Sequence, residues 1–154
     1  MIDGPGGDDP ALRPNQVLVA SVAFSPLDED RQRRMLKVCE KELLTPYGLR
    51  SLASDEEGYT PVYGGDIRKR DSAYHQGTVW GWLMGPFLSA DYRINHDKEK
   101  VMRLLEAYCK DLNQHGLGSI SEIFDGESPY TSRGCIAQAW SVAAALWVLD
   151  NVER

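Results

Sequence analysis

Three runs of apolar residues along this chain are too apolar around their circumference to lie on a protein surface as helices. They are "VLVASVAF", "VWGWLMGPF" and "AWSVAAALWVL". A helix that is apolar on most sides has to be buried between neighbours. Residues 25–44 and 95–116 instead repeat apolar residues every three or four positions, which predicts helices with one wet face. We therefore expect an all-α protein, although the valines of the first run would also suit a strand.

Two long segments, 45–76 and 117–134, interrupt this helical pattern. Ordered segments of such length without their own periodicity are uncommon in compact domains and are usually functional. If consecutive helices pack antiparallel, alternate loops fall at the same end of the bundle. The sequence therefore predicts that "RDSAYHQG" and "SEIFDGESP", one from each segment, lie beside each other.

Composition narrows the range of partners. The 154 residues fit one domain, expected over 1–154, and a hydrophobic content of 42% is enough for a core. A net charge of −6 without a basic cluster argues against nucleic acid and against an anionic membrane surface. The first residues do not resemble a signal peptide, and no run is apolar enough for a membrane span. We expect a cytoplasmic protein whose partner is small, neutral or another protein.

The three cysteines, Cys39, Cys109 and Cys135, are widely spaced, and no histidines cluster near them. A zinc site needs closely spaced Cys or His ligands. We therefore expect buried thiols, no metal site and no cofactor.

Glu122 is the first candidate for chemistry. It precedes Ile123 and Phe124, and a partly desolvated carboxylate in such a setting is poised to accept a proton. The alternative is a capping box, because Ser119 and Glu122 match the S-x-x-E pattern. The residues that follow, "FDGESP", end a helix rather than begin one.

Other polar and aromatic residues have two interpretations each. His75 is either a functional residue (a nucleophile's base, a metal ligand or a sugar ligand) or a structural hydrogen-bonding residue. Trp80 with Trp82 forms either an aromatic platform or part of the core. Capping by Asn15 would explain only one member of the polar cluster that also contains Arg13 and Gln16. A carboxylate, aromatic rings and amide or guanidinium donors, without a phosphate loop or metal site, together predict a sugar pocket.

Five segments in order make the chain resemble a known family. They are "LRPNQ", "LLTPYGLRSL", "RDSAYHQGTVWGWLMGPF", "SEIFDGESP" and "RGCIAQAWSVAAAL". From about Asp3 to the end, the chain is similar to the C-terminal part of the bacterial and archaeal glycogen debranching enzymes, the amylo-alpha-1,6-glucosidase family.

This resemblance implies part of an (α/α)6 barrel that hydrolyses α-1,6-linked glucose at glycogen branch points with inversion. Glu122 matches the carboxylate that acts as general base. The segment "YHQGTVW" matches a pocket-lining element, and "RPNQ" matches another polar stretch near the pocket. The substrate-binding residues implied are Arg13, Asn15, Gln16, Tyr74, His75, Gln76 and Trp80.

The resemblance also implies a departure from the family. The family's proposed general acid is an aspartate upstream of "RPNQ", within helices that this chain does not contain. The chain is therefore expected to be a fragment without its acid, and the alternative function is a non-catalytic glucan-binding or interaction module. Another sugar reaction, such as trehalose hydrolysis or epimerisation, fits the motifs less well. Apolar helices that lack neighbours predict self-association.

Overall fold

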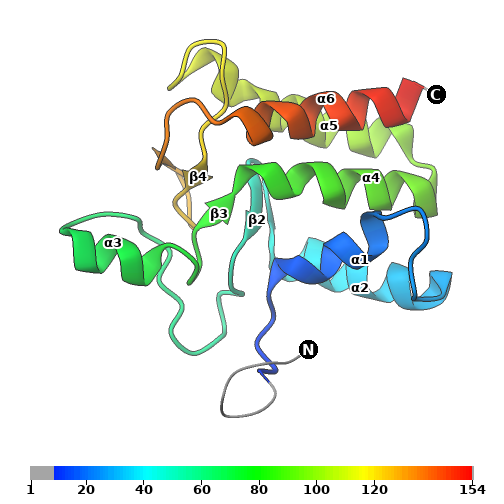
Figure 1. Cartoon of the computed structure of the whole chain (residues 1–154), viewed down its shortest axis with the longest axis horizontal. Helices are drawn as coiled ribbons and strands as arrows, with labels where there is room; N and C mark the ends of the chain where they lie inside the picture. Colours follow the sequence, from blue (N-terminus) through cyan, green and yellow to red (C-terminus); the bar gives the residue numbers. More distant parts are fainter. Residues whose placement is uncertain (1–8, 154) are drawn as a thin grey trace.

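The computed structural model describes residues 9–153, of which about half are helical. Figure 1 shows the order of the elements along the chain. The α-helices are α1 (Val17–Ser21), α2 (Glu29–Glu42), α3 (Ile67–Ala73), α4 (Met84–Asn95), α5 (Lys98–Tyr108) and α6 (Ala139–Glu153). The 3₁₀ turns are η1 (Pro14–Gln16), η2 (Gly81–Leu83) and η3 (Cys109–Asn113). The strands are β1 (Leu44–Thr45), β2 (Gly48–Arg50), β3 (Val79–Trp80), β4 (Ile123–Phe124) and β5 (Ser132–Arg133).

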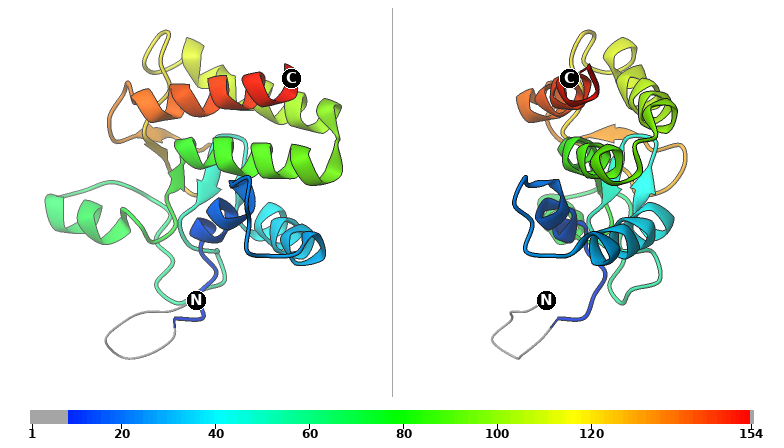
Figure 2. Two further views of the ribbon diagram at one scale, coloured as in Figure 1. Left: turned by 45° about the vertical axis from the view of Figure 1, so that its right-hand side comes forward. Right: turned by 90° about the vertical axis from the view of Figure 1, so that its right-hand side faces the viewer.

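Helix α4 lies at the centre of the helical layer. It packs against α6 on one side and against α1 and α2 on the other, and α5 contacts both α4 and α6 (Figures 1 and 2). The backbones of α4 and α6 approach closely, because a methyl group built on Gly85 would lie 3.0 Å from the Cα of Ala144. Every residue of α4 from Met84 to Asp91 is buried, as its apolar sequence predicts.

The amphipathic helices form for local reasons. At the start of α2, the Asp28 carboxylate accepts a 2.8 Å hydrogen bond from the backbone N–H of Arg31. Asp97 caps α5 in the same way through Lys100. Side-chain caps of this type satisfy backbone donors that have no partner within the helix. The helices expected over 25–44 and 95–116 are thus confirmed, with later starts and earlier ends than predicted.

The helix expected over "VLVASVAF", residues 17–24, ends earlier than predicted. Helix α1 ends at Ser21, and Val22 is already extended. The guanidinium of Arg93 donates hydrogen bonds to the carbonyl oxygens of Ala20 and Val22, so these terminal acceptors are satisfied without a further turn. Phe24 beyond this point is 95% exposed.

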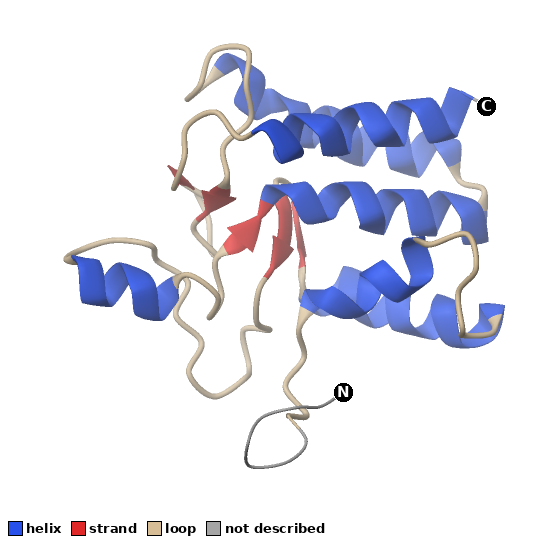
Figure 3. Cartoon of the chain, in the orientation of Figure 1, coloured by secondary structure: helices blue, strands red, loops and turns tan. Residues whose placement is uncertain are grey.

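A five-stranded antiparallel sheet corrects the expected all-α class. The strand order is β1-β2-β3-β4-β5, and the register pairs Leu49 with Trp80 and Val79 with Phe124. Figure 3 shows the sheet at the end of the molecule where α4 and α6 begin. Strands of two or three residues are too short to show alternation in sequence, and pairing supplies their buried backbone groups with partners. The described helices do not by themselves make up an (α/α)6 barrel, which stays a prediction.

The segment 45–76 also contains a helix that periodicity does not predict. Helix α3 begins at an Asp66 cap and buries only Ala73, while Ile67 is exposed. It projects away from the other helices on the sheet side of the molecule (Figure 1). With one buried side chain, α3 has no apolar face for a pattern to reveal.

Two further expectations about burial are met only in part. Cys39 is buried, which raises its pKa to about 12, and Cys109 is half-buried, but Cys135 is exposed. Helix α6 buries Ala144 and Val148 yet leaves its opposite face open, because nothing in residues 9–153 covers that side.

No helix within the described part of the chain has the length and apolarity needed to cross a membrane.

Candidate functional site

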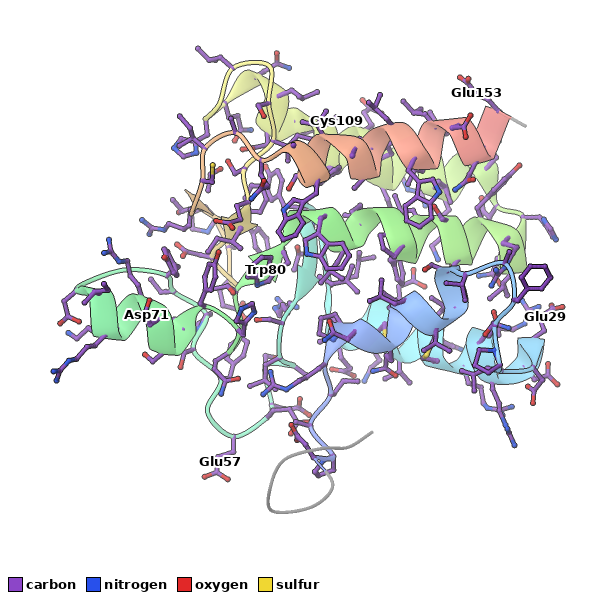
Figure 4. The ribbon with its side chains drawn as sticks, in the orientation of Figure 1. Glu29, Glu57, Asp71, Trp80, Cys109 and Glu153 are labelled. Atoms are coloured by element: carbon purple, nitrogen blue, oxygen red, sulfur yellow. The ribbon has the colours of Figure 1, made fainter. Side chains whose placement is uncertain are left out.

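A cavity of about 510 Å³ opens where the sheet meets the helical layer. Figure 4 shows Trp80 at this end of the molecule, with Glu29 and Glu153 at the other. The cavity is lined by residues from both ends of the sequence: Arg13, Pro14, Asn15, Ser51, Tyr74, His75, Trp80, Trp82, Leu83, Glu122 and Trp140. The expectation that Glu122 and His75 lie at the same end of the assembly is therefore confirmed.

The sheet and the helix ends place these side chains. Tyr74 and His75 follow directly on α3, whereas Trp80 is the last residue of β3. Strand β3 pairs with β4, and the backbone N–H of Gly81 donates a 3.3 Å hydrogen bond to the carbonyl oxygen of Glu122. Strand β3, which follows the first irregular segment, thus pairs with β4 of the second, and this pairing brings Glu122 to the wall of the cavity.

Three donors hold the Glu122 carboxylate. The Tyr74 hydroxyl donates a 2.7 Å hydrogen bond to Oε1, and the backbone N–H of Cys135 donates one of 3.0 Å to Oε2. The Gln138 amide makes a longer contact of 3.4 Å with Oε1. No helix begins at Ser119, so the capping-box interpretation is wrong. Hydrogen bonds to both oxygens of a carboxylate fix its orientation.

Gly134 makes room for this carboxylate. Its φ is +66°, and a methyl group built there would lie 2.4 Å from Oε2 of Glu122. A left-handed backbone and the absence of a side chain are both required at this position.

Aromatic rings form one side of the cavity. The His75 and Trp80 rings stack with centroids 4.8 Å apart and planes 8° apart. Trp80 is only 7% exposed, and its indole N–H donates to the carbonyl oxygen of Tyr74 at 3.1 Å. Trp80 therefore supports the His75 ring, and the more exposed Trp82 and Trp140 are the rings available to a ligand. Trp82 and Trp140 lie 5.7 Å apart.

Sequence reasoning missed Trp140. The residue lies in the first turn of α6, within a run interpreted as core, and it is 47% exposed. The signal available was its place at the start of that helix, directly after an irregular segment with other candidate residues.

The polar residues expected to bind substrate divide into two groups. Arg13 lines the cavity, but its Nη1 donates to the carbonyl oxygens of Ser51 and His75, and its Nη2 donates to Oε1 of Gln76 at 2.9 Å. The side chains of Gln76 and Gln16 bond to Arg13 and are not among those that line this cavity. These bonds join the three residues to one another and to the cavity wall, and their contact with a substrate stays a prediction.

Asn15 has a free side chain. It is exposed at the cavity edge and makes no side-chain hydrogen bond to another residue of 9–153. Its amide can donate to and accept from a ligand.

Two titratable side chains of the site, His75 and Tyr74, have shifted pKa values. Burial and the Arg13 guanidinium lower the pKa of His75 below its ordinary value of 6.5, while the Glu122 carboxylate opposes this shift. His75 is therefore neutral at pH 7. Burial and the hydrogen bond to Glu122 raise the pKa of Tyr74, so its hydroxyl stays protonated and remains a donor.

Glu122 is the one carboxylate that lines this cavity in the described part of the chain. Within residues 9–153, no three His, Cys, Asp or Glu side chains are grouped so that they could hold a metal ion. The chemistry available is therefore that of an oriented carboxylate beside aromatic rings and an amide.

An oriented carboxylate in an open, aromatic-lined cavity is typical of proteins that act on carbohydrates. The chain belongs to the amylo-alpha-1,6-glucosidase family, whose sequence profile matches residues 1–147. The family resemblance seen in the motifs is thereby confirmed.

One curated relative is the glycogen debranching enzyme of Saccharomyces cerevisiae, to which the chain is 25% identical over 162 aligned positions. The match covers 90% of this chain and 10% of the yeast protein, so the chain spans about a tenth of that relative's length.

Proposed function

We propose that this chain supplies the general base of an inverting amylo-alpha-1,6-glucosidase, with Glu122 as that base. The observation that supports this role best is the pair of hydrogen bonds from Tyr74 and Cys135, which hold both carboxylate oxygens beside the cavity. Membership of the family supports an α-1,6-linked glucose at a branch of glycogen as the substrate.

In the proposed reaction, the Glu122 carboxylate accepts a proton from water as the water oxygen bonds to the anomeric carbon. The bond from that carbon to the leaving oxygen breaks on the opposite face, so the configuration inverts. The leaving oxygen takes its proton from a second carboxyl group, which in inverting enzymes stands roughly 6.5–9.5 Å from the base. Trp82 and Trp140 would contact the apolar face of the glucose ring, and Asn15 its hydroxyls.

Among the described residues, Glu122 is the one carboxylate that lines the cavity, so the base is best tested with a substrate that needs no acid. Sugar leaving groups need protonation, and a positioned acid contributes about 10²–10⁴-fold to the rate. Fluoride leaves as an anion without a proton. α-D-Glucosyl fluoride therefore tests the base on its own.

The experiment measures fluoride release from α-D-glucosyl fluoride and identifies the first-formed anomer of glucose by NMR. We expect release above the uncatalysed rate with β-glucose as the first product, and we expect Glu122→Gln to abolish it. Glu106→Gln, the same substitution at an exposed site on α5, serves as the control and should leave release unchanged. Equal release by wild type and Glu122→Gln would remove Glu122 from the base role.

A second candidate is a glucan-binding module that does not cleave its ligand. Residues 9–153 contribute one carboxylate to the cavity lining, and hydrolysis of a glycoside by the family's route requires two, which favours this alternative. Calorimetry with isomaltose, the α-1,6-linked disaccharide of glucose, separates the two. Binding of isomaltose without any release from glucosyl fluoride would support the binding module.

We also propose that the helices form part of an (α/α)6 barrel and that the chain acts in the cytoplasm. Family membership supports both statements.

A further inference from the structure

A buried carboxylate lies behind the strand that follows Glu122. Asp111, in η3, is fully buried, and both of its oxygens accept hydrogen bonds. Oδ2 accepts from the backbone N–H of Ser121 at 2.8 Å, and Oδ1 accepts from the hydroxyl of Ser132 at 2.8 Å. A buried carboxylate without such partners would be costly, so these two bonds are strongly favoured.

The two residues that donate to Asp111 lie before and after the candidate base Glu122 in the chain. Ser121 is the residue before Glu122, and Ser132 lies in β5, where it pairs with Phe124 of β4. Asp111 therefore ties the chain entering β4 to the neighbouring strand from outside the sheet.

The same two strands position the Glu122 side chain. The backbone N–H of Glu122 donates to the carbonyl oxygen of Cys135 at 2.9 Å, and the N–H of Cys135 donates back to Oε2 of Glu122. Cys135 comes two residues after β5, so its position depends on that strand. A shift between β4 and β5 would change the direction of the carboxylate.

We propose that Asp111 is a positioning residue for Glu122. This inference rests on the proposed function of Glu122 as a base. By bonding Ser121 and Ser132 at once, Asp111 holds the register of β4 and β5 and thereby the geometry of the pair formed by Cys135 and Glu122. Asp111 is not among the residues that line the cavity, so its proposed role is to position Glu122 and not to touch substrate.

The test compares Ser132→Ala and Asp111→Asn with wild type in fluoride release from α-D-glucosyl fluoride. Ser132→Ala removes one bond, and Asp111→Asn turns an NH₂ group toward one of the two donors. Since displacement of a reacting group by about 1 Å can cost 10²-fold, we expect kcat to fall about 10- to 100-fold while KM changes little. Ser132→Thr keeps the hydroxyl and should restore kcat.

A matched control excludes a general loss of stability. Ile94→Val removes one buried methylene at the far end of α4, so it should lower Tm without changing kcat. Variants of Asp111 and Ser132 that keep wild-type kcat, or that lose kcat only in proportion to Tm as Ile94→Val does, would overturn the positioning role.

Amide hydrogen exchange separates failure of this inference from failure of the proposed function. Asp111→Asn and Ser132→Ala should speed exchange at the Ser121 and Cys135 amides, whereas Ile94→Val should not. If wild type releases no fluoride but the exchange rates change in this way, the base role falls and the structural link from Asp111 to Glu122 stands. Unchanged exchange at both amides would overturn the link itself.

Discussion

The Tyr74 hydroxyl and Oε1 of Glu122, 48 residues apart in sequence, are joined by a 2.7 Å hydrogen bond. The bond connects the residue that follows α3 to the residue that precedes β4. It therefore makes Tyr74 a partner of the candidate base, whereas the family resemblance implies only a sugar contact for it.

Tyr74→Phe should lower kcat for α-D-glucosyl fluoride more than it weakens isomaltose binding. Hydrogen bonds to charged groups contribute about 1.5–3 kcal/mol, which corresponds to a loss of roughly 10- to 100-fold if the bond orients the base. Steady-state fluoride release and calorimetry measure the two effects. Tyr59→Phe is the matched control, because Tyr59 donates to Glu127 at 2.6 Å outside the cavity. A loss of binding equal to the loss of kcat would make Tyr74 a ligand only.

Gly134→Ala should both destabilise the protein and displace Glu122. A left-handed backbone costs a residue with a side chain about 1–2 kcal/mol, and the new methyl group would lie 2.4 Å from Oε2 of Glu122. Gly118→Ala supplies the control, since Gly118 has a φ of +96° and nothing within 4 Å of its added methyl group. Both variants should lower Tm, but only Gly134→Ala should reduce fluoride release. Equal activity in the two variants would show that the carboxylate has room to move.

His75 should titrate below its ordinary pKa of 6.5. Arg13→Gln removes a nearby positive charge and should raise the midpoint, Arg13→Lys should keep it low, and Glu122→Gln should lower it further. NMR titration of the imidazole signals measures these midpoints, with His96 and His115 as internal references. A midpoint that does not respond to Arg13→Gln would contradict the electrostatic account.

The lowered pKa of His75 makes the free energy of unfolding depend on pH. Because the folded pKa is depressed, the unfolded chain binds more protons between the folded pKa and about 6.5. The contribution of neutral His75 is therefore complete above about pH 6.5 and is lost as the pH falls through that window. His75→Asn should weaken this part of the dependence of Tm on pH.

The outer face of α6 should promote self-association. Leu146 and Trp147 of this helix are 61% and 41% exposed, and Trp140 in its first turn is 47% exposed. Contiguous apolar patches on soluble monomers are usually covered by a partner. Light scattering should give a mass above 17.2 kDa, and Leu146→Gln should reduce it more than Met102→Gln on α5. A monodisperse wild-type monomer would refute the prediction.

The amphipathic helices of this protein can be predicted from its sequence, because they depend on interactions between residues close together in the chain. The caps at Asp28 and Asp97 act on backbone N–H groups three residues away, and the buried face of α2 repeats every three or four residues. Such interactions are contained within one segment, so their pattern is visible in the sequence. The grouping of the two irregular segments was also predictable, because alternation of loops follows from antiparallel helices.

Tertiary structure alone decided the sheet and the partners of Glu122. Strands of two or three residues leave no alternating pattern, and they form only where distant segments supply their hydrogen bonds. The donors from Tyr74 and Cys135 and the buried support from Asp111 reach Glu122 through this pairing. The Arg13 guanidinium likewise donates hydrogen bonds to Ser51, His75 and Gln76, residues 38 to 63 positions away. A sequence records which groups can form hydrogen bonds, but the choice between a ligand and another part of the chain depends on which of them folding brings within about 3 Å.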